Sequence, residues 1–274
     1  MRMLWVAFAF VLGASPAFAS PTATDADLLA STEQAFAEGV SLRDDSAKAR
    51  PAFARAALGY DELWKHGHHH ADVALNRANA HRLAGNLPAA IVALNAGLAA
   101  TPWSRPLQVA LEDARNAVGY PLTGDLAAQC RPPVATGIST RMSADEAWLI
   151  AGGLWLLLWG AVARFAMVRR PAWLLCVAAC AVGLAILGAA WRHDIAERQQ
   201  ANVHPLVVLA DDVVLRKGNA DAYPGRLEAK LPRGVEARKL TERGGWFQIQ
   251  LAGGVVGWVP EASLLDMRSN NGGP

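Results

Sequence analysis

The sequence predicts a multi-domain membrane protein with an all-α region, two transmembrane helices and an all-β region, in that order. Two long runs, residues 147–168 and 172–191, are almost free of charge. Before them, residues 24–120 repeat apolar side chains at helical spacing, and after them residues 205–267 form short β-type runs between turn signals. The chain of 274 residues is 53% hydrophobic and 18% charged, which excludes a disordered protein.

Residues 1–19 are typical of a secretory signal peptide. Arg2 stands near the start, an apolar stretch follows from Met3 to Leu12, and Ala17-Phe18-Ala19 ends the segment. A basic start, a short apolar core and an A-x-A ending are the features of such peptides. We expect cleavage after Ala19, and the alternative is an uncleaved anchor helix.

Residues 24–120 are rich in alanine and leucine and predict a stack of helices. Asn86 is placed to cap one helix at its N-terminus. The apolar face of that helix consists of Leu87, Ile91, Leu94 and Leu98, and the preceding helix faces it with Ala74, Ala78 and His81. Small side chains opposite large ones allow the two helices to pack closely.

Seven positions of this helix pair follow a repeat register of roughly 34 residues: Ala74, Ala78, Gly85, Ala90, Ile91, Leu98 and Pro102. On these residues the pair resembles a tetratricopeptide repeat, although Arg77 replaces a leucine and Gly97 an alanine. A looser unit precedes it, with Ala56, Tyr60 and Leu63 at the matching positions. A helix over residues 107–118 would cap the stack. Because such stacks need about three repeats, we expect this domain to lean on a partner.

Residues 121–146 have the composition of a linker, with the stretches PLTGD, RPPV and TGIST. Ser143 and Glu146, at its end, fit a capping box for a helix that begins there. Cys130 lies in this linker; a disulfide to a second chain is one hypothesis, and a free thiol is the one we favour. Cys176 and Cys180 stand one turn apart in the second apolar run and are expected to be packing residues.

The two apolar runs are long enough to cross a hydrocarbon core of about 30 Å at about 1.5 Å per residue. Their short connection carries Arg164, Arg169 and Arg170, and short positive loops stay in the cytoplasm. Trp148 and Trp191 then fall at the outer interface. Both flanking regions are therefore expected outside the cytoplasm of an inner-membrane protein, in agreement with a signal peptide. The alternative is a buried helical hairpin in a soluble core.

Residues 192–204 predict a polar helical stalk, and a β-rich composition begins at Pro205. The expected strands are 207–209, 213–215, 235–240, 246–251 and 255–259, which together predict a small barrel. The stretches Val214-Leu215-Arg216-Lys217-Gly218, Leu231-Pro232-Arg233-Gly234, Gly245-Trp246 and Gly257-Trp258-Val259-Pro260 resemble a bacterial SH3-like domain over residues 205–267. The resemblance implies a five-strand barrel that recognises peptides or cell-wall material.

The same resemblance implies that Trp246, Trp258 and Pro260 bind the ligand. Strand alternation places Trp246 on the polar face and Phe247 on the core face. The groove of the family is incomplete, because Ser263 replaces its tyrosine and residues 213–217 replace its early aromatic motif. We hypothesise a shallow aromatic platform for an extended peptide. The alternative is that the two tryptophans pack on each other or under the loop of residues 218–225.

The complete order of segments, with Leu75-Asn76-Arg77-Ala78-Asn79-Ala80, Gly85 and Ala90-Ile91, resembles the BatE-like aerotolerance proteins. That resemblance implies a helper in an envelope complex. It also implies membrane proteins with von Willebrand A domains and a MoxR-type ATPase as neighbours.

Nothing in the sequence indicates an enzyme or a bound cofactor, because G-x-S-x-G, H-E-x-x-H and phosphate-loop motifs are absent. A net charge of +2 without a long basic run excludes a dedicated nucleic-acid binder. His66-Gly67-His68-His69-His70 is either a weak metal site or, as we favour, a polar turn between helices. An extracytoplasmic interaction scaffold is the expected function, and peptidoglycan binding or sensing is the alternative; a metal-handling protein ranks third.

Overall fold

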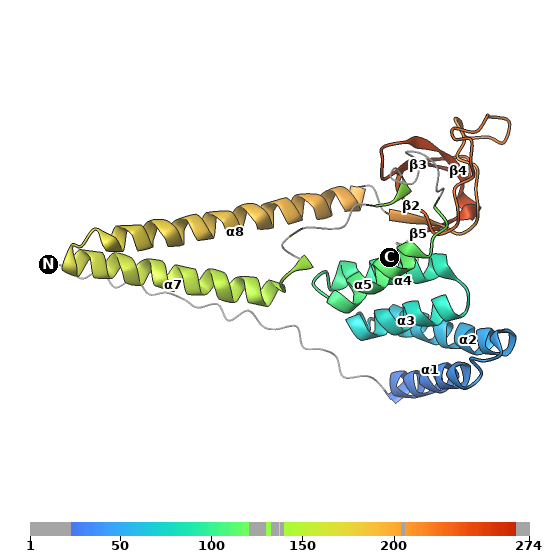
Figure 1. Cartoon of the computed structure of the whole chain (residues 1–274), viewed down its shortest axis with the longest axis horizontal. Helices are drawn as coiled ribbons and strands as arrows, with labels where there is room; N and C mark the ends of the chain where they lie inside the picture. The colour runs from blue at the N-terminus through green and yellow to red at the C-terminus, as the bar shows by residue number, and fades with distance from the viewer. Residues whose placement is uncertain (1–22, 121–129, 133–136, 138–139, 204–205, 267–274) are drawn as a thin grey trace.

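The computed structural model describes residues 23–120, 130–132, 137, 140–203 and 206–266 (Figure 1). The predicted signal peptide, residues 1–19, lies outside the described residues. Most of the predicted linker lies outside them too, as do Pro205 and Met267 at the two ends of the predicted β region.

Five antiparallel helices form the N-terminal stack, each packed against the next (Figure 1). They are α1 (Ala23–Ser41), α2 (Ser46–Lys65), α3 (Ala71–Leu83), α4 (Leu87–Ala100) and α5 (Arg105–Asn116). The Asn86 side chain accepts a hydrogen bond from the Ala89 N–H, so the predicted cap of α4 is confirmed. Ile91 and Leu94 are buried against the small side chains of α3, as the spacing predicted.

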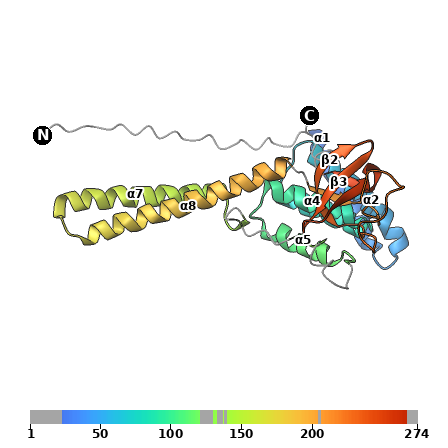
Figure 2. The same cartoon turned by 90° about the horizontal axis from the view of Figure 1, so that it is seen from above.

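Two further helices, α7 (Ala144–Val168) and α8 (Ala172–Val203), form an antiparallel hairpin that projects away from the stack (Figures 1 and 2). The predicted capping box is present: the Ser143 hydroxyl accepts from the Glu146 N–H, and the Glu146 carboxylate accepts from the Ser143 N–H. The predicted stalk continues the second helix without a break.

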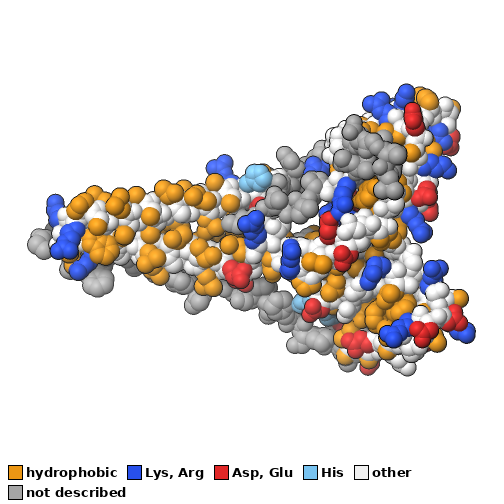
Figure 3. Space-filling model, viewed as in Figure 1, with side chains coloured by type: hydrophobic (Ala, Val, Ile, Leu, Met, Phe, Trp, Pro, Cys, Tyr) orange, Lys and Arg blue, Asp and Glu red, His pale blue; other side chains and the backbone are white. Residues whose placement is uncertain are grey.

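Both hairpin helices are long and apolar enough to cross a membrane, with mean hydropathies of 1.7 and 2.3. Hydrophobic side chains cover the visible face of the hairpin (Figure 3). Only 6% of the first apolar window and 0% of the second is buried, so the hairpin is not the core of a soluble domain.

The C-terminal region is a five-stranded antiparallel sheet with the order β4-β3-β2-β1-β5. Its strands are β1 (Leu206–Leu209), β2 (Glu236–Arg243), β3 (Trp246–Leu251), β4 (Val256–Pro260) and β5 (Leu264–Asp266). The sheet is open, because β4 and β5 stand at opposite edges. The sequence predicted a closed barrel, and on this point the structure differs.

One predicted strand is wrong. Residues 213–215 form only an isolated bridge, Val213 with Leu231, while Leu264–Asp266 supplies the fifth strand. The backbone of Arg216 then turns to β4, where it exchanges two hydrogen bonds of 2.9 Å with Trp258. The segment therefore divides its pairing between two partners and cannot form a continuous ladder.

The helical stack and the sheet share one hydrophobic core. Helix α4 packs on β1 and β5, and a single cluster of buried side chains runs from Ile91 and Leu107 to Val208 and Ile249. The Gly234 backbone lies so close to the helical stack that an added Cβ would come within 2.9 Å of the Val118 side-chain atom Cγ2. The sheet thus covers part of the short stack, which the sequence led us to expect would lean on a partner.

Cys130 belongs to the same core and is fully buried. Burial raises the pKa of its thiol. A disulfide to a second chain is therefore not accessible in this arrangement, in agreement with the favoured free thiol.

Candidate functional site

The outer face of β3 and β4 brings the three predicted ligand-binding residues together. Trp246 lies directly across from Pro260, and Gln248 lies directly across from Trp258. Directly opposed residues of an antiparallel pair point to the same side of the sheet. Trp246, Trp258 and Pro260 therefore occupy one face, and each is partly exposed.

The inner face of the same two strands is apolar and buried. Phe247, Ile249 and Val259 alternate with the outer residues and belong to the shared core. This alternation explains why Trp246 stands on the polar side: its neighbour Phe247 already occupies the core position. Within the described part of the chain, no ring contact joins Trp246 to Trp258.

A β-bulge in β2 decides which charges border the tryptophans. The pairing of β2 with β3 shifts between Lys239 and Thr241, which leaves Leu240 as the extra residue. Beyond the bulge, Arg243 pairs with Trp246 on the outer face and Glu242 pairs with Phe247 on the inner side. In a regular ladder without the bulge, Leu240 would pair with Gln248 and Glu242 would stand beside Trp246.

The Lys239 side chain reinforces the inner side of the bulge. Its ammonium nitrogen lies 3.7 Å from the centre of the Phe247 ring and 2.9 Å from a carboxylate oxygen of Glu242. This cation–π and ion-pair arrangement keeps both charges of the bulge away from the tryptophan face.

The loop after Arg216 borders Trp258 on the side away from β3. The Arg216 guanidinium donates hydrogen bonds to the backbone oxygens of Asp221 and Tyr223 and forms a 3.0 Å ion pair with the Asp221 carboxylate. These contacts hold the loop in place, and the Tyr223 side chain remains 48% exposed on it. Sequence reasoning did not include Tyr223 in the site.

Positive side chains and amides surround the three site residues. We call these three residues, together with the positions beside them on the outer face of the sheet, the aromatic face. Arg216, Arg243 and Gln248 lie directly across from the site residues, and Arg238, Thr241, Gln250 and Val256 complete the same face of the sheet. No carboxylate occurs among these strand positions. Arg216 is already paired with Asp221, but the exposed Arg238 and Arg243 suit an acidic ligand, because arginine binds carboxylates by charge-assisted hydrogen bonds.

Ser263, where the SH3-like pattern has a tyrosine, lies in a short 3-10 helix (Glu261–Ser263) after Pro260. Its backbone oxygen accepts a hydrogen bond of 2.9 Å from the Ala210 N–H. The position thus joins β1 to the end of the sheet and adds no aromatic ring to the aromatic face.

A buried ion pair fixes the sheet to the helical stack. The Glu236 carboxylate, at the start of β2, accepts hydrogen bonds from Arg115 Nε at 2.6 Å, Arg115 Nη2 at 3.1 Å and Asn95 Nδ2 at 2.6 Å. Glu236 has a side-chain exposure of 0% and Arg115 one of 11%. Sequence reasoning missed this cluster, since its members come from α4, α5 and β2.

Tyr120 lies beside this pair. Burial, with a smaller effect from the nearby Glu236 charge, raises the pKa of the Tyr120 hydroxyl to about 12. Its buried hydroxyl has no hydrogen-bond partner among the described residues. The neutral phenol is therefore the form that this environment stabilises.

Arg77, which departs from the leucine of the repeat pattern, is buried inside the stack. Its Nε lies 2.5 Å from Asp61 Oδ1, which also lies 3.2 Å from His81 Nε2, and its guanidinium lies 5.6 Å from the centre of the Trp64 ring. Burial raises the pKa of Asp61, but the His81 hydrogen bond and the Arg77 charge outweigh it, so this pKa lies below its ordinary value. The arginine thus serves a structural ion cluster.

The histidine stretch forms the turn between α2 and α3. His66 Nδ1 lies 2.7 Å from Asp25 Oδ1, and His68 Nε2 lies 3.2 Å from Asp25 Oδ2. These contacts tie the start of α1 to the turn. In the described ranges, no group of three or more His, Cys, Asp or Glu side chains is arranged to hold a metal ion.

Comparison with known proteins returned no match to a protein-family model, a curated protein or a solved structure.

Proposed function

We propose that this chain is a membrane-anchored interaction scaffold whose aromatic face binds an extended, acidic segment of a protein partner outside the cytoplasm. The observation that carries the proposal is the joint position of Trp246, Trp258 and Pro260 on one face, whose paired strand positions among the described residues hold no carboxylate. Partly exposed tryptophans beside arginine are the residue types that dominate protein interfaces.

The rigid attachment of the sheet supports a binding role. The shared core and the Glu236–Arg115 pair fix the aromatic face relative to the helical stack. A preorganised surface pays less conformational entropy on binding than a mobile one. We further propose that the helices form tetratricopeptide-like repeats and the sheet an SH3-like module, which would make both regions interaction domains.

Membrane anchoring is proposed through α7 and α8. Arg164, Arg169 and Arg170 are exposed at the far end of the hairpin, and such positive connections stay in the cytoplasm. Both flanking regions would then face the outside of an inner membrane. By the BatE-like resemblance, the proposed partners are membrane proteins with von Willebrand A domains in an envelope stress complex.

The test compares two neighbouring variants in the full-length chain. Trp246→Ala should leave the fold intact and weaken partner capture at least about tenfold, because it removes an interface anchor from a solvent-facing position. Phe247→Ala should unfold the sheet, since truncating a buried phenylalanine costs about 3–5 kcal/mol. Circular dichroism melting and crosslinked capture from native membranes are the two measurements. Equal collapse of both variants would show that Trp246 is structural.

Charge reversal tests the acidic ligand separately. Arg243→Glu should weaken capture, whereas the matched change Glu242→Arg, one residue away on the inner side, should not.

A peptidoglycan ligand is the alternative proposal, because stem peptides are also extended and carry carboxylates. Sedimentation with purified cell wall that depends on Trp246 would favour it over a protein partner.

A further inference from the structure

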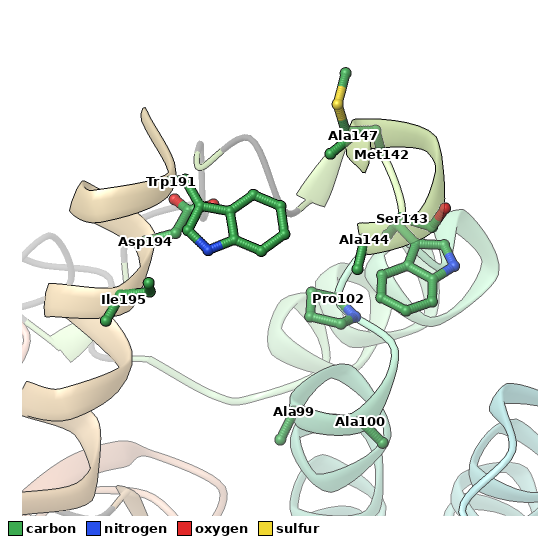
Figure 4. A pocket seen from close by; sticks show the side chains of 11 residues that line it. Ala99, Ala100, Pro102, Met142, Ser143, Ala144, Ala147, Trp191, Asp194 and Ile195 are labelled. Carbon is green, nitrogen blue, oxygen red and sulfur yellow. The ribbon is translucent and has the colours of Figure 1, made fainter. Parts of the chain in front are cut away.

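A cavity of about 120 Å³ lies where the helical stack meets the hairpin (Figure 4). Pro102 and Trp103 line it from the turn after α4, Ser143 and Ala147 from the start of α7, and Trp191 and Asp194 from α8. Its wall is thus mainly apolar but includes a hydroxyl and a carboxylate. Asp194 is only 8% exposed, so the carboxylate belongs to the interior of the junction.

A second cavity, of about 220 Å³, adjoins the first between α7 and α8. The two cavities share Ala147 and Trp191, and the second is otherwise lined by apolar residues that include Leu184, Leu187 and Gly188. From Leu184 to Trp191 this crevice extends about 10 Å along the helix. The pair of cavities is therefore polar at one end and apolar at the other.

The positions of Trp148 and Trp191 indicate how deep in a membrane the crevice would lie. The Trp148 and Trp191 rings lie 6.2 Å apart at the end of the hairpin nearer the stack, and such rings mark a membrane interface. A crevice of about 10 Å below them stays within one half of a hydrocarbon core about 30 Å thick.

We propose that the two cavities bind one phospholipid from the leaflet nearer the helical stack, with an acyl chain in the crevice and an amine-bearing headgroup beside Ser143 and Asp194. The inference rests on the proposed membrane anchoring. An acidic wall at headgroup level attracts an ammonium group by charge complementarity. A partner helix is a poor occupant, because it is about 10–12 Å wide and would follow the whole span.

The experiment uses the full-length chain in vesicles that contain phosphatidylethanolamine with a photoactivatable acyl chain. Adducts should concentrate on residues 147–151 and 184–191. An even spread that includes Leu156 and Leu175, which are exposed elsewhere on the hairpin, would show only surrounding lipid and overturn the proposal. Equal labelling of the crevice by the phosphatidylglycerol analogue would overturn the headgroup assignment.

Two glycine variants provide the control. A Cβ at Gly188 or at Gly160 meets nothing within 4 Å, and only Gly188 lines the crevice. Gly188→Leu should fill the crevice and lower labelling there about tenfold, whereas Gly160→Leu should leave it unchanged. Circular dichroism establishes that both variants fold. An equal effect of both, or no effect of Gly188→Leu, contradicts the proposal.

Two measurements separate this inference from its premise and from a rival occupant. Carbonate extraction of native membranes tests anchoring: a chain released from the membrane fails the proposed function itself, whereas an integral chain without localised labelling fails only the lipid site. If Gly188→Leu changes the mass of the purified protein particle, the crevice binds a second copy of the chain, and the proposed lipid site is wrong.

Discussion

At the scale of single residues, Leu240 determines the chemistry around Trp246. Because the bulge leaves it unpaired, Glu242 lies on the inner side of the sheet and Arg243 on the outer one. Strand alternation alone predicted the outward position of Trp246, because alternation is a local property. The bulge could not be predicted, since no glycine or proline marks it within β2. The Glu236 cluster could not be predicted either, because its partners lie 121 and 141 residues away.

Loss of the Glu236 carboxylate should destabilise the chain strongly. Glu236→Ala leaves the Arg115 charge buried without a partner, which typically costs about 3–5 kcal/mol. Glu242→Ala, on the same strand, removes only a partly exposed ion pair with Lys239 and should cost no more than about 1 kcal/mol. Unfolding in detergent, followed by circular dichroism, compares the two. Similar losses for both variants would contradict the structural role of the buried pair.

Alkaline pH should destabilise the fold through Tyr120. Its pKa rises from 10.0 to about 12 on folding, so between these values the unfolded chain loses a proton that the folded chain keeps. The unfolded state then binds fewer protons, and stability falls as pH rises through this window. Tyr120→Phe should lack this component. Between pH 9 and 12, the unfolding midpoint of the native chain should fall more than that of the Tyr120→Phe variant. A difference between the two midpoints that stays constant with pH would refute the raised pKa of Tyr120.

At the scale of elements, α3 and α4 approach each other closely at Gly97. A Cβ at this position would lie 2.5 Å from Ala74 Cβ and 3.0 Å from Leu107 Cδ1. The repeat pattern has alanine here, so the glycine is a local adjustment that permits this contact. The helices themselves were predictable, because caps and apolar spacing are encoded within each segment. Strand β5 was not, since three residues carry too little pattern to distinguish a strand from a loop.

Gly97→Ala should therefore lower stability although alanine favours helices. The gain in helix propensity is about 1 kcal/mol, whereas overpacking a tight contact costs about 1–3 kcal/mol. Adding Ala74→Gly to the same chain removes the methyl group that the new one meets and should restore part of the loss. Melting temperatures of the three chains test this. A more stable Gly97→Ala chain would show that the helices separate without cost.

At the scale of the whole molecule, the helical stack and the sheet lie at the same end of the hairpin (Figure 1). Two separate stretches of sequence, before and after the spans, thereby build one body. Apolar length predicted the two long apolar helices that the structure contains, and the arginine bias predicts an orientation for them that a labelling experiment tests. The contact between stack and sheet could not be foreseen, because each region by itself has the composition of an independent domain.

The proposed orientation predicts the accessibility of single cysteines. In chains whose native cysteines are replaced by serine, Ser46→Cys and Ala252→Cys should react with a membrane-impermeant thiol reagent on cells with a permeable outer layer. Arg170→Cys, at the opposite end of the hairpin, should react only after lysis. Ser46 and Ala252 are both exposed in the structure, so burial cannot explain a failure of these cysteines to react. If only one of these two cysteines reacts, the helical stack and the sheet do not lie on the same side of the membrane.

The shared core also imposes a waiting time during synthesis. Asn95 and Glu236 are 141 residues apart, and both apolar helices come between them. At roughly 5–20 residues per second, the ribosome adds Glu236 roughly 7–28 s after Asn95. Throughout that interval the apolar face of α4 and the Arg115 guanidinium remain without their cover. Exposed apolar surface of this kind promotes aggregation, so slow translation between these points is expected to lower the yield of folded chain.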